Sequence, residues 1–128
     1  DYATTGKYYN YTYVDRKSEG DFKGTMGKGF ERFRREVKRA AQFDSFLYVV
    51  IEESLENVIK HNYKSIFHKT SLPYLWHNMR KITHEFKDHC QFIFSGSREA
   101  SEDLIPRLLY FGKDMWEVDI QYFIDKKI

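Results

Sequence analysis

The hydrophobic positions of this chain change their period several times, which predicts strands that alternate with helices. Residues 9–17 alternate between apolar and polar, as in a half-buried strand. Residues 30–42 place apolar side chains three or four positions apart, as in a helix that buries one face. Residues 45–52 contain a continuous apolar run, typical of a strand covered on both faces, and residues 90–94 (CQFIF) predict another buried strand. We therefore expect an α/β domain, with a mixed central β-sheet flanked by α-helices.

Two more helices are predicted after residue 70. Residues 71–86 form a helical pattern that opens with Pro73, a residue suited to the first turn. Residues 101–111 form another, with Ser101 as the expected N-cap and Gly112 as its end. Both patterns lie next to predicted strands, in keeping with an α/β order.

The remaining segments are less regular. Residues 18–29 contain four glycines and predict a mobile loop. Residues 54–70 are expected to be helical at first and looser later, and residues 116–124 fit either a strand or a helix.

Composition places these elements in one domain and limits the setting. The 128 residues contain no apolar run near the roughly 18 needed to cross a bilayer, so no membrane partner is expected. The single Cys90 cannot form an internal disulfide, which favours a reducing, intracellular compartment, the cytoplasm or the nucleus. Residues 16–39 hold nine basic and four acidic side chains, which points to a polyanionic partner; the alternative is an ordinary mixed surface.

The predicted strand at 9–17 ends in charged residues. Period-two geometry puts Asp15 and Lys17 on one face, together with three tyrosines. A carboxylate can bind Mg²⁺ or Mn²⁺, and a neighbouring lysine can orient or deprotonate a water or offset charge on a phosphate. The alternative for so short a motif is a solvated ion pair at the end of a strand.

A longer pattern surrounds this pair. It comprises Asp1-Tyr2, the segment 14–21 (VDRKSEGD), the Arg32-Phe33 start of a helix, and the strand LYVVIE that ends at Glu52. In order and spacing it resembles the nuclease domain of the XPF-type structure-specific endonucleases, members of the PD-(D/E)XK superfamily. The resemblance covers about residues 1–53 and resumes, more faintly, over 71–111. It implies a restriction-endonuclease-like core, whose first strand would lie before Asp1.

The resemblance also implies roles for individual residues. Asp1, Asp15 and the backbone carbonyl of Arg16 would bind Mg²⁺ or Mn²⁺, and Lys17 would handle the attacking water. Asp21 would be the closing acid of the signature, with Glu36 and Glu52 in a second tier. Asp15 stands where the family has Glu, and Glu36 stands where it has Gln. Residues 54–70 do not match and are interpreted as a possible insertion, and no helix-hairpin-helix segment is present.

Three other groups of side chains are ambiguous. The basic side chains of 23–39 can follow DNA phosphates or form a solvated helix face. The four tyrosines of 8–13 can stack on unpaired bases or lie half-buried in a sheet. The five histidines include a pair one heptad apart, but without further metal motifs they are interpreted as ordinary surface histidines. The candidate nucleic-acid contacts are Lys23, Lys28, Arg32, Arg35 and Arg39.

The expected function is therefore that of a metal-dependent DNA endonuclease acting at a branch, flap or junction, and family likeness suggests a homo- or heterodimer. A second hypothesis is a catalytically silent relative that binds DNA or serves as a scaffold. A third is a nuclease for RNA or unbranched DNA.

Overall fold

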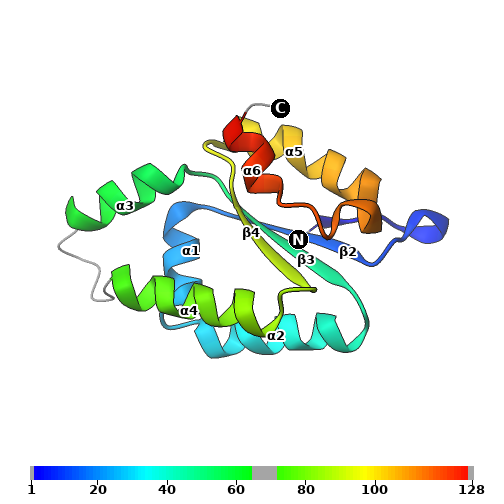
Figure 1. Cartoon of the computed structure of the whole chain (residues 1–128), viewed down its shortest axis with the longest axis horizontal. Coiled ribbons are helices and arrows are strands. Elements are labelled where there is room, and N and C mark those ends of the chain that lie inside the picture. The colour runs from blue at the N-terminus through cyan, green and yellow to red at the C-terminus, as the bar shows by residue number, and fades with distance from the viewer. Residues whose placement is uncertain (1, 65–71, 127–128) are drawn as a thin grey trace.

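A four-stranded mixed sheet forms the centre of the domain, in the order β1-β2-β3-β4 (Figure 1). The computed structural model describes residues 2–64 and 72–126. The strands are β1 (Tyr2–Ala3), β2 (Thr12–Lys17), β3 (Phe46–Ile51) and β4 (Cys90–Phe94). β1 pairs antiparallel with β2, whereas β2, β3 and β4 run parallel. The expected α/β fold with a mixed sheet flanked by helices is thus confirmed.

One face of the sheet is covered by three helices, which lie below the strands in Figure 1. They are α1 (Glu19–Met26), α2 (Phe30–Gln42) and α4 (Leu72–Glu85). Their buried side chains pack on alternate residues of β3 and β4, including Val49 and Phe92. The predictions for 30–42 and 71–86 are confirmed, because both segments carry strong helical periodicity.

The opposite face is covered by α5 (Arg98–Phe111) and α6 (Ile120–Lys126), with a 3₁₀ turn at Gly112–Met115 between them. A second apolar core lies here, and Tyr48 and Val50 of β3 are fully buried in it. β3 is therefore covered on both faces, as its continuous apolar sequence predicted.

The prediction of a mobile loop at 18–29 is wrong, because most of this segment is α1. Ser18 caps the helix, its side-chain oxygen accepting a hydrogen bond from the backbone nitrogen of Asp21 at 3.2 Å. Phe22 and Met26, four residues apart, are fully buried in the first core. Tertiary packing of these two side chains overrides the poor helix propensity of the glycines.

Two predicted boundaries also move. β2 begins at Thr12 rather than at residue 9, since Tyr11 has a φ of +60° and interrupts the extended backbone. The helix expected at 101–111 begins at Arg98, capped by Ser97, whose side chain accepts a hydrogen bond from the nitrogen of Ala100 at 3.1 Å. The expected cap Ser101 is instead a buried residue inside the helix.

The ambiguous segments resolve as helices. Residues 55–64 form α3 (Leu55–Lys64), in agreement with the early part of the prediction for 54–70, and residues 65–70 lie outside the described residues. The tail from 116 onward turns into α6 rather than a strand. In the described parts of the chain, no helix combines the length and the apolar character that a bilayer-spanning segment requires.

Candidate functional site

Asp15 and Lys17 enter a pocket formed between β2, α1 and α2. Both lie on the face of β2 that also carries Tyr13, because side chains two residues apart share a face. The pocket has a volume of about 470 Å³. Its polar lining consists of Asp15, Arg16, Lys17, Asp21, Thr25, Arg32 and Glu36.

The lysine and the carboxylate are paired directly. Lys17 Nζ lies 3.0 Å from Asp15 Oδ2, and the two side chains are only 17% and 15% exposed. Cross-strand neighbours explain this shielding, since Asp15 lies opposite Val49 and Lys17 opposite Ile51, both fully buried. The pair is therefore half-buried at the margin of the first core, where an ionic contact is stronger than on an open surface.

Glycines keep this pocket open. Gly20 and Gly24 lie four residues apart in α1 and so share one face, which lines the pocket. A Cβ added at either position would meet no atom within 4 Å, so the space beside both is unfilled. The glycines that suggested a loop in the sequence are part of the pocket wall.

Two more predicted acids reach the same pocket. Asp21 is exposed in the first turn of α1, and Glu36 projects from α2, where it lies 3.9 Å from the guanidinium Nε of Arg32. The structure therefore brings together Asp15, Lys17, Asp21 and Glu36, although they come from three different elements. This set offers carboxylate oxygens, which are the donors that Mg²⁺ and Mn²⁺ prefer.

Glu52 does not join them. Its carboxylate lies 3.1 Å from Arg16 Nε, and Arg16 is also 3.4 Å from Glu102 of α5. Arg16 alternates with Asp15 along β2, so its side chain extends to the opposite face of the sheet, where it pairs with Glu52. The second-tier prediction for Glu52 is thus not supported by its position.

The backbone carbonyl of Arg16, which is the predicted metal ligand, is directed differently from its side chain. The carbonyl oxygens of Tyr11 and Lys17 accept hydrogen bonds from β3, at 2.9 Å each. Alternate residues of a strand direct their carbonyls to opposite edges, so the Arg16 carbonyl points away from β3. Asp1, the other predicted ligand, lies outside the described residues.

Most of the predicted cationic contacts form an exposed surface on α2 and the turn before it. Lys28, Arg32, Arg35 and Arg39 are all exposed, and the Arg32 side chain is 84% accessible. This surface borders the pocket that contains Asp15, since Arg32 lines that pocket. Four cations beside a carboxylate pocket suit a phosphate backbone.

Lys23 does not belong to this surface. Its side chain is 6% exposed, and its Nζ lies 3.1 Å from Glu19 Oε1 one turn earlier in α1. The prediction of a DNA contact for Lys23 is wrong because the segment is a packed helix rather than an open loop. The lysine instead pairs with Glu19 within α1.

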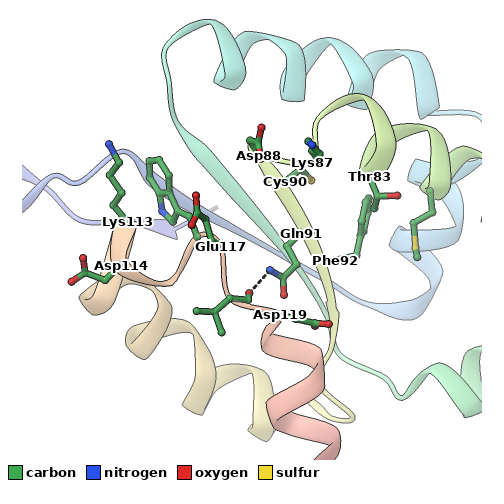
Figure 2. Close-up of a pocket in the computed structure, with 13 residues that line it drawn as sticks. Thr83, Lys87, Asp88, Cys90, Gln91, Phe92, Lys113, Asp114, Glu117 and Asp119 are labelled. Carbon is green, nitrogen blue, oxygen red and sulfur yellow. Dashed lines mark hydrogen bonds between the residues drawn. The ribbon is translucent and has the colours of Figure 1, made fainter.

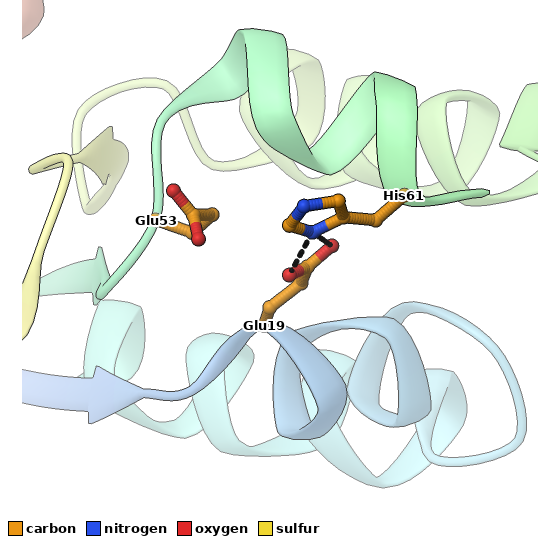
Figure 3. Close-up of side chains that lie close together, drawn as sticks. All are labelled: Glu19, Glu53 and His61. Carbon is orange, nitrogen blue, oxygen red and sulfur yellow. Dashed lines mark hydrogen bonds and ion pairs between the residues drawn. The ribbon is translucent and has the colours of Figure 1, made fainter. Parts of the chain in front are cut away.

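Glu19 also takes part in a cluster that the sequence did not reveal. One ligand atom from each of Glu19, Glu53 and His61 lies within 4.8 Å of the other two (Figure 3). His61 Nδ1 is 2.8 Å from Glu19, while Glu53 accepts hydrogen bonds from Asn57 and from the backbone of residue 54, both at 2.9 Å. These hydrogen bonds lower the pKa of Glu53.

Carboxylates and an imidazole are donors that a transition-metal ion accepts. Both oxygens of Glu19 are already engaged, Oε1 by Lys23 and Oε2 by His61, whereas Lys17 contacts one oxygen of Asp15. The arrangement is better explained as an ionic network that joins α1 to α3. No sequence signal could have found it, because Glu19 lies more than thirty residues before Glu53 and His61 in the sequence.

A separate hollow of about 630 Å³ lies along the outer edge of β4 (Figure 2). Gln91 closes one side by donating to the carbonyl of Val118 at 2.8 Å and accepting from the nitrogen of Ile120 at 2.9 Å. Cys90 borders it, but burial raises the pKa of this thiol far above its usual range. The hollow thus has no activated thiolate, and we do not assign chemistry to it.

Among the described residues, no group of three or more potential metal ligands contains more than one histidine. His77 and His84 are exposed on α4, and His89 Nδ1 contacts the carbonyl oxygen of Ser45 at 2.9 Å. Within the part of the chain that the structure describes, the one group of three or more potential metal ligands is the cluster at Glu19. His68 lies outside the described residues.

No protein-family model matches this chain, and no significant similarity to a curated protein or a solved structure is found. The resemblance to XPF-type nucleases therefore stays a prediction.

Proposed function

We propose that this domain is a metal-dependent endonuclease that hydrolyses phosphodiester bonds in DNA. The observation that carries the proposal is the pocket itself, in which Asp15 and Lys17 lie 3.0 Å apart between two helices. Asp21 and Glu36 add carboxylates, and the exposed cations of α2 lie directly beside them. A carboxylate, a lysine and a phosphate-binding surface are the parts that such hydrolysis requires.

The donor set fits a hard divalent cation. Asp15 would hold it through its carboxylate together with the Arg16 carbonyl, and Asp21 lines the same pocket. When bound, Mg²⁺ or Mn²⁺ would supply Lewis-acid stabilisation of charge on the phosphate. Asp1 remains a proposed further ligand on the strength of the family resemblance alone.

Lys17 has the role of positioning the nucleophile. Its ammonium is held by Asp15, so it can donate a hydrogen bond to a water or to a non-bridging phosphate oxygen in a fixed direction. The water attacks phosphorus as the bond to the 3′ oxygen breaks; the water loses a proton, the 3′ oxygen gains one, and a 5′ phosphate and a 3′ hydroxyl result. Arg32, at the border of the pocket, would bind a neighbouring phosphate.

The experiment is cleavage of labelled linear, flapped and four-way-junction DNA in Mn²⁺. Asp15→Asn should lower the rate at least a hundredfold, and addition of EDTA should abolish cleavage. Asp103→Asn is the matched control, because Asp103 is an exposed carboxylate on α5, paired with Arg107 on the far side of the sheet. Cleavage that Asp15→Asn leaves intact would refute the site.

One observation favours a second function, DNA binding without cleavage. The basic surface of α2 does not depend on the acids, since Lys28, Arg35 and Arg39 are exposed whether or not a cation is bound. Salt-sensitive DNA binding with no cleavage on any substrate would support this second function. For either function we propose an intracellular compartment, because a DNA ligand is found there. Dimer formation is a further proposal, to be tested by sedimentation.

A further inference from the structure

A second pocket with aromatic walls lies next to the candidate active site. Its volume is about 500 Å³. Three tyrosines from the segment before and within β2 line it, and Phe43 and Arg39 line it from α2 and its C-terminal end. The tyrosines are Tyr9, Tyr11 and Tyr13.

The rings are held in place by their own contacts. The centroid of Tyr9 is 4.7 Å from that of Tyr11 and 6.0 Å from that of Tyr13, and the hydroxyls of Tyr9 and Tyr13 contact each other. Tyr11 has a φ of +60°, a conformation that a bulky residue adopts only where its surroundings enforce it. The Tyr11 carbonyl accepts a hydrogen bond from the backbone nitrogen of Phe46 at 2.9 Å, which ties this residue to β3.

These fixed rings are nevertheless open to solvent. Tyr11 is 52% exposed and Phe43 is 68% exposed. Preorganised aromatic faces that remain accessible are suited to stacking on a planar ligand, because little conformational entropy is lost when the ligand binds.

The aromatic pocket is continuous with the carboxylate pocket. Glu36 lines both of them. On β2, Tyr13 belongs to one pocket and Asp15 to the other, and these two residues are about 6.6 Å apart along the strand. A polymer whose phosphate lay at Asp15 would therefore bring its next unit to the tyrosines.

We propose that the aromatic pocket binds an unpaired nucleobase adjacent to the scissile phosphate. This inference rests on the proposed nuclease function and defines its substrate class as DNA that is single-stranded next to the cut. Base–aromatic stacking tolerates every base, so the pocket would select for strandedness rather than sequence. Arg39 supplies a guanidinium beside the rings, which can stack on the base or bind its phosphate.

The exposed rings of Tyr110 and Phe111 do not offer the same combination. Tyr110 and Phe111 on α5 are also exposed, at 81% and 50%. They lie in the C-terminal part of the chain, where residues 99–128 carry seven acidic and four basic side chains, a composition that repels phosphate. Charge therefore favours the pocket beside α2 as the site for a nucleic acid.

The test compares two flapped DNAs in EDTA, where no cleavage competes with binding. One carries 2-aminopurine at the first unpaired position, and the other has an abasic residue there. We expect the 2-aminopurine fluorescence to be quenched on binding and the base-bearing DNA to bind about tenfold more tightly than the abasic DNA. Tyr11→Asn, which tolerates a positive φ, and Phe43→Ser should each reduce both effects, whereas Tyr110→Leu should not.

Cleavage in Mn²⁺ is measured alongside, so that the two ideas fail separately. Equal affinity for both DNAs, with cleavage intact, overturns the base pocket and leaves the nuclease standing; a pocket that serves a protein partner would give this result. Absence of both binding and cleavage overturns the nuclease and the base pocket together. Circular dichroism and the unfolding midpoint of each variant verify that a lost effect does not reflect a lost fold.

Discussion

The ion pair between Lys23 and Glu19 provides a quantitative test of the structure. Glu19→Gln removes the negative charge without changing the shape of the side chain, and it leaves an ammonium that is 6% exposed without its carboxylate. Breaking a fully buried pair costs about 3–5 kcal/mol. Because Glu19 is 21% exposed, water can partly replace it, and we expect a loss of about 2–3 kcal/mol in the free energy of unfolding.

Lys23→Met should behave differently. The methionine keeps the apolar stem that packs in α1, and Glu19 retains its contact with His61, so we expect a loss of at most about 1 kcal/mol. The double variant should be about as stable as Lys23→Met alone. The resulting coupling energy between the two side chains would be about 2–3 kcal/mol, equal to the loss expected for Glu19→Gln alone.

The assay is urea denaturation followed by tryptophan fluorescence and circular dichroism. Glu56→Gln is the matched control, because Glu56 and Lys60 form the same i,i+4 pair on α3 at 2.9 Å but are 75% and 60% exposed. An exposed pair of this kind contributes about 0.5 kcal/mol or less. If Glu19→Gln is no more destabilising than Glu56→Gln, the interpretation of Lys23 as a buried structural cation is wrong.

Three further outcomes are expected. Cys90 should resist alkylation at pH 8 in the native protein and react on unfolding, because it is buried and its pKa is raised; rapid native-state labelling would contradict its position. The hydroxyl of Tyr48 donates to the Met115 carbonyl at 3.0 Å, and burial raises the pKa of Tyr48. Its contribution to the free energy of unfolding is therefore fully present below about pH 10 and falls above it, where the tyrosine ionises in the unfolded chain. Tyr48→Phe should show a smaller fall in stability between pH 9 and 11. The pKa of Glu53 is lowered, so this residue stabilises the fold above about pH 4.3, and the stabilisation is lost as the pH falls through the folded-state pKa. Asn57→Ala should raise the pKa of Glu53 in an NMR titration, because it removes a hydrogen bond to the carboxylate. An unchanged pKa would exclude that hydrogen bond as the cause.

The elements that the sequence predicted well are those with one dominant signal. β3 is a continuous apolar run, β4 is apolar except for Gln91, and α2 and α4 repeat their buried residues at helical spacing. α1 was missed because its glycines argue for a loop locally, while the packing of Phe22 that makes it a helix depends on side chains far away in the sequence.

The site was predicted in part for the same reason. Period two within a single strand is enough to place Asp15 and Lys17 together, and the structure agrees. To predict the position of Glu52, the register between β2 and β3 must be known, and single-sequence patterns do not contain it. In the observed register the Glu52 side chain contacts Arg16. The buried position of Lys23 could not be predicted without first predicting α1.

The glycines of α1 also bear on how the domain opens. Gly20 and Gly24 each lower the intrinsic stability of a helix by about 1 kcal/mol relative to alanine, and α1 has only eight residues. Such a helix persists only while Phe22 and Met26 remain docked on the sheet and α4. Amide exchange should therefore be faster in α1 than in β3. Since α1 forms a wall of the proposed active site, that wall would unfold locally before the central sheet and refold after it.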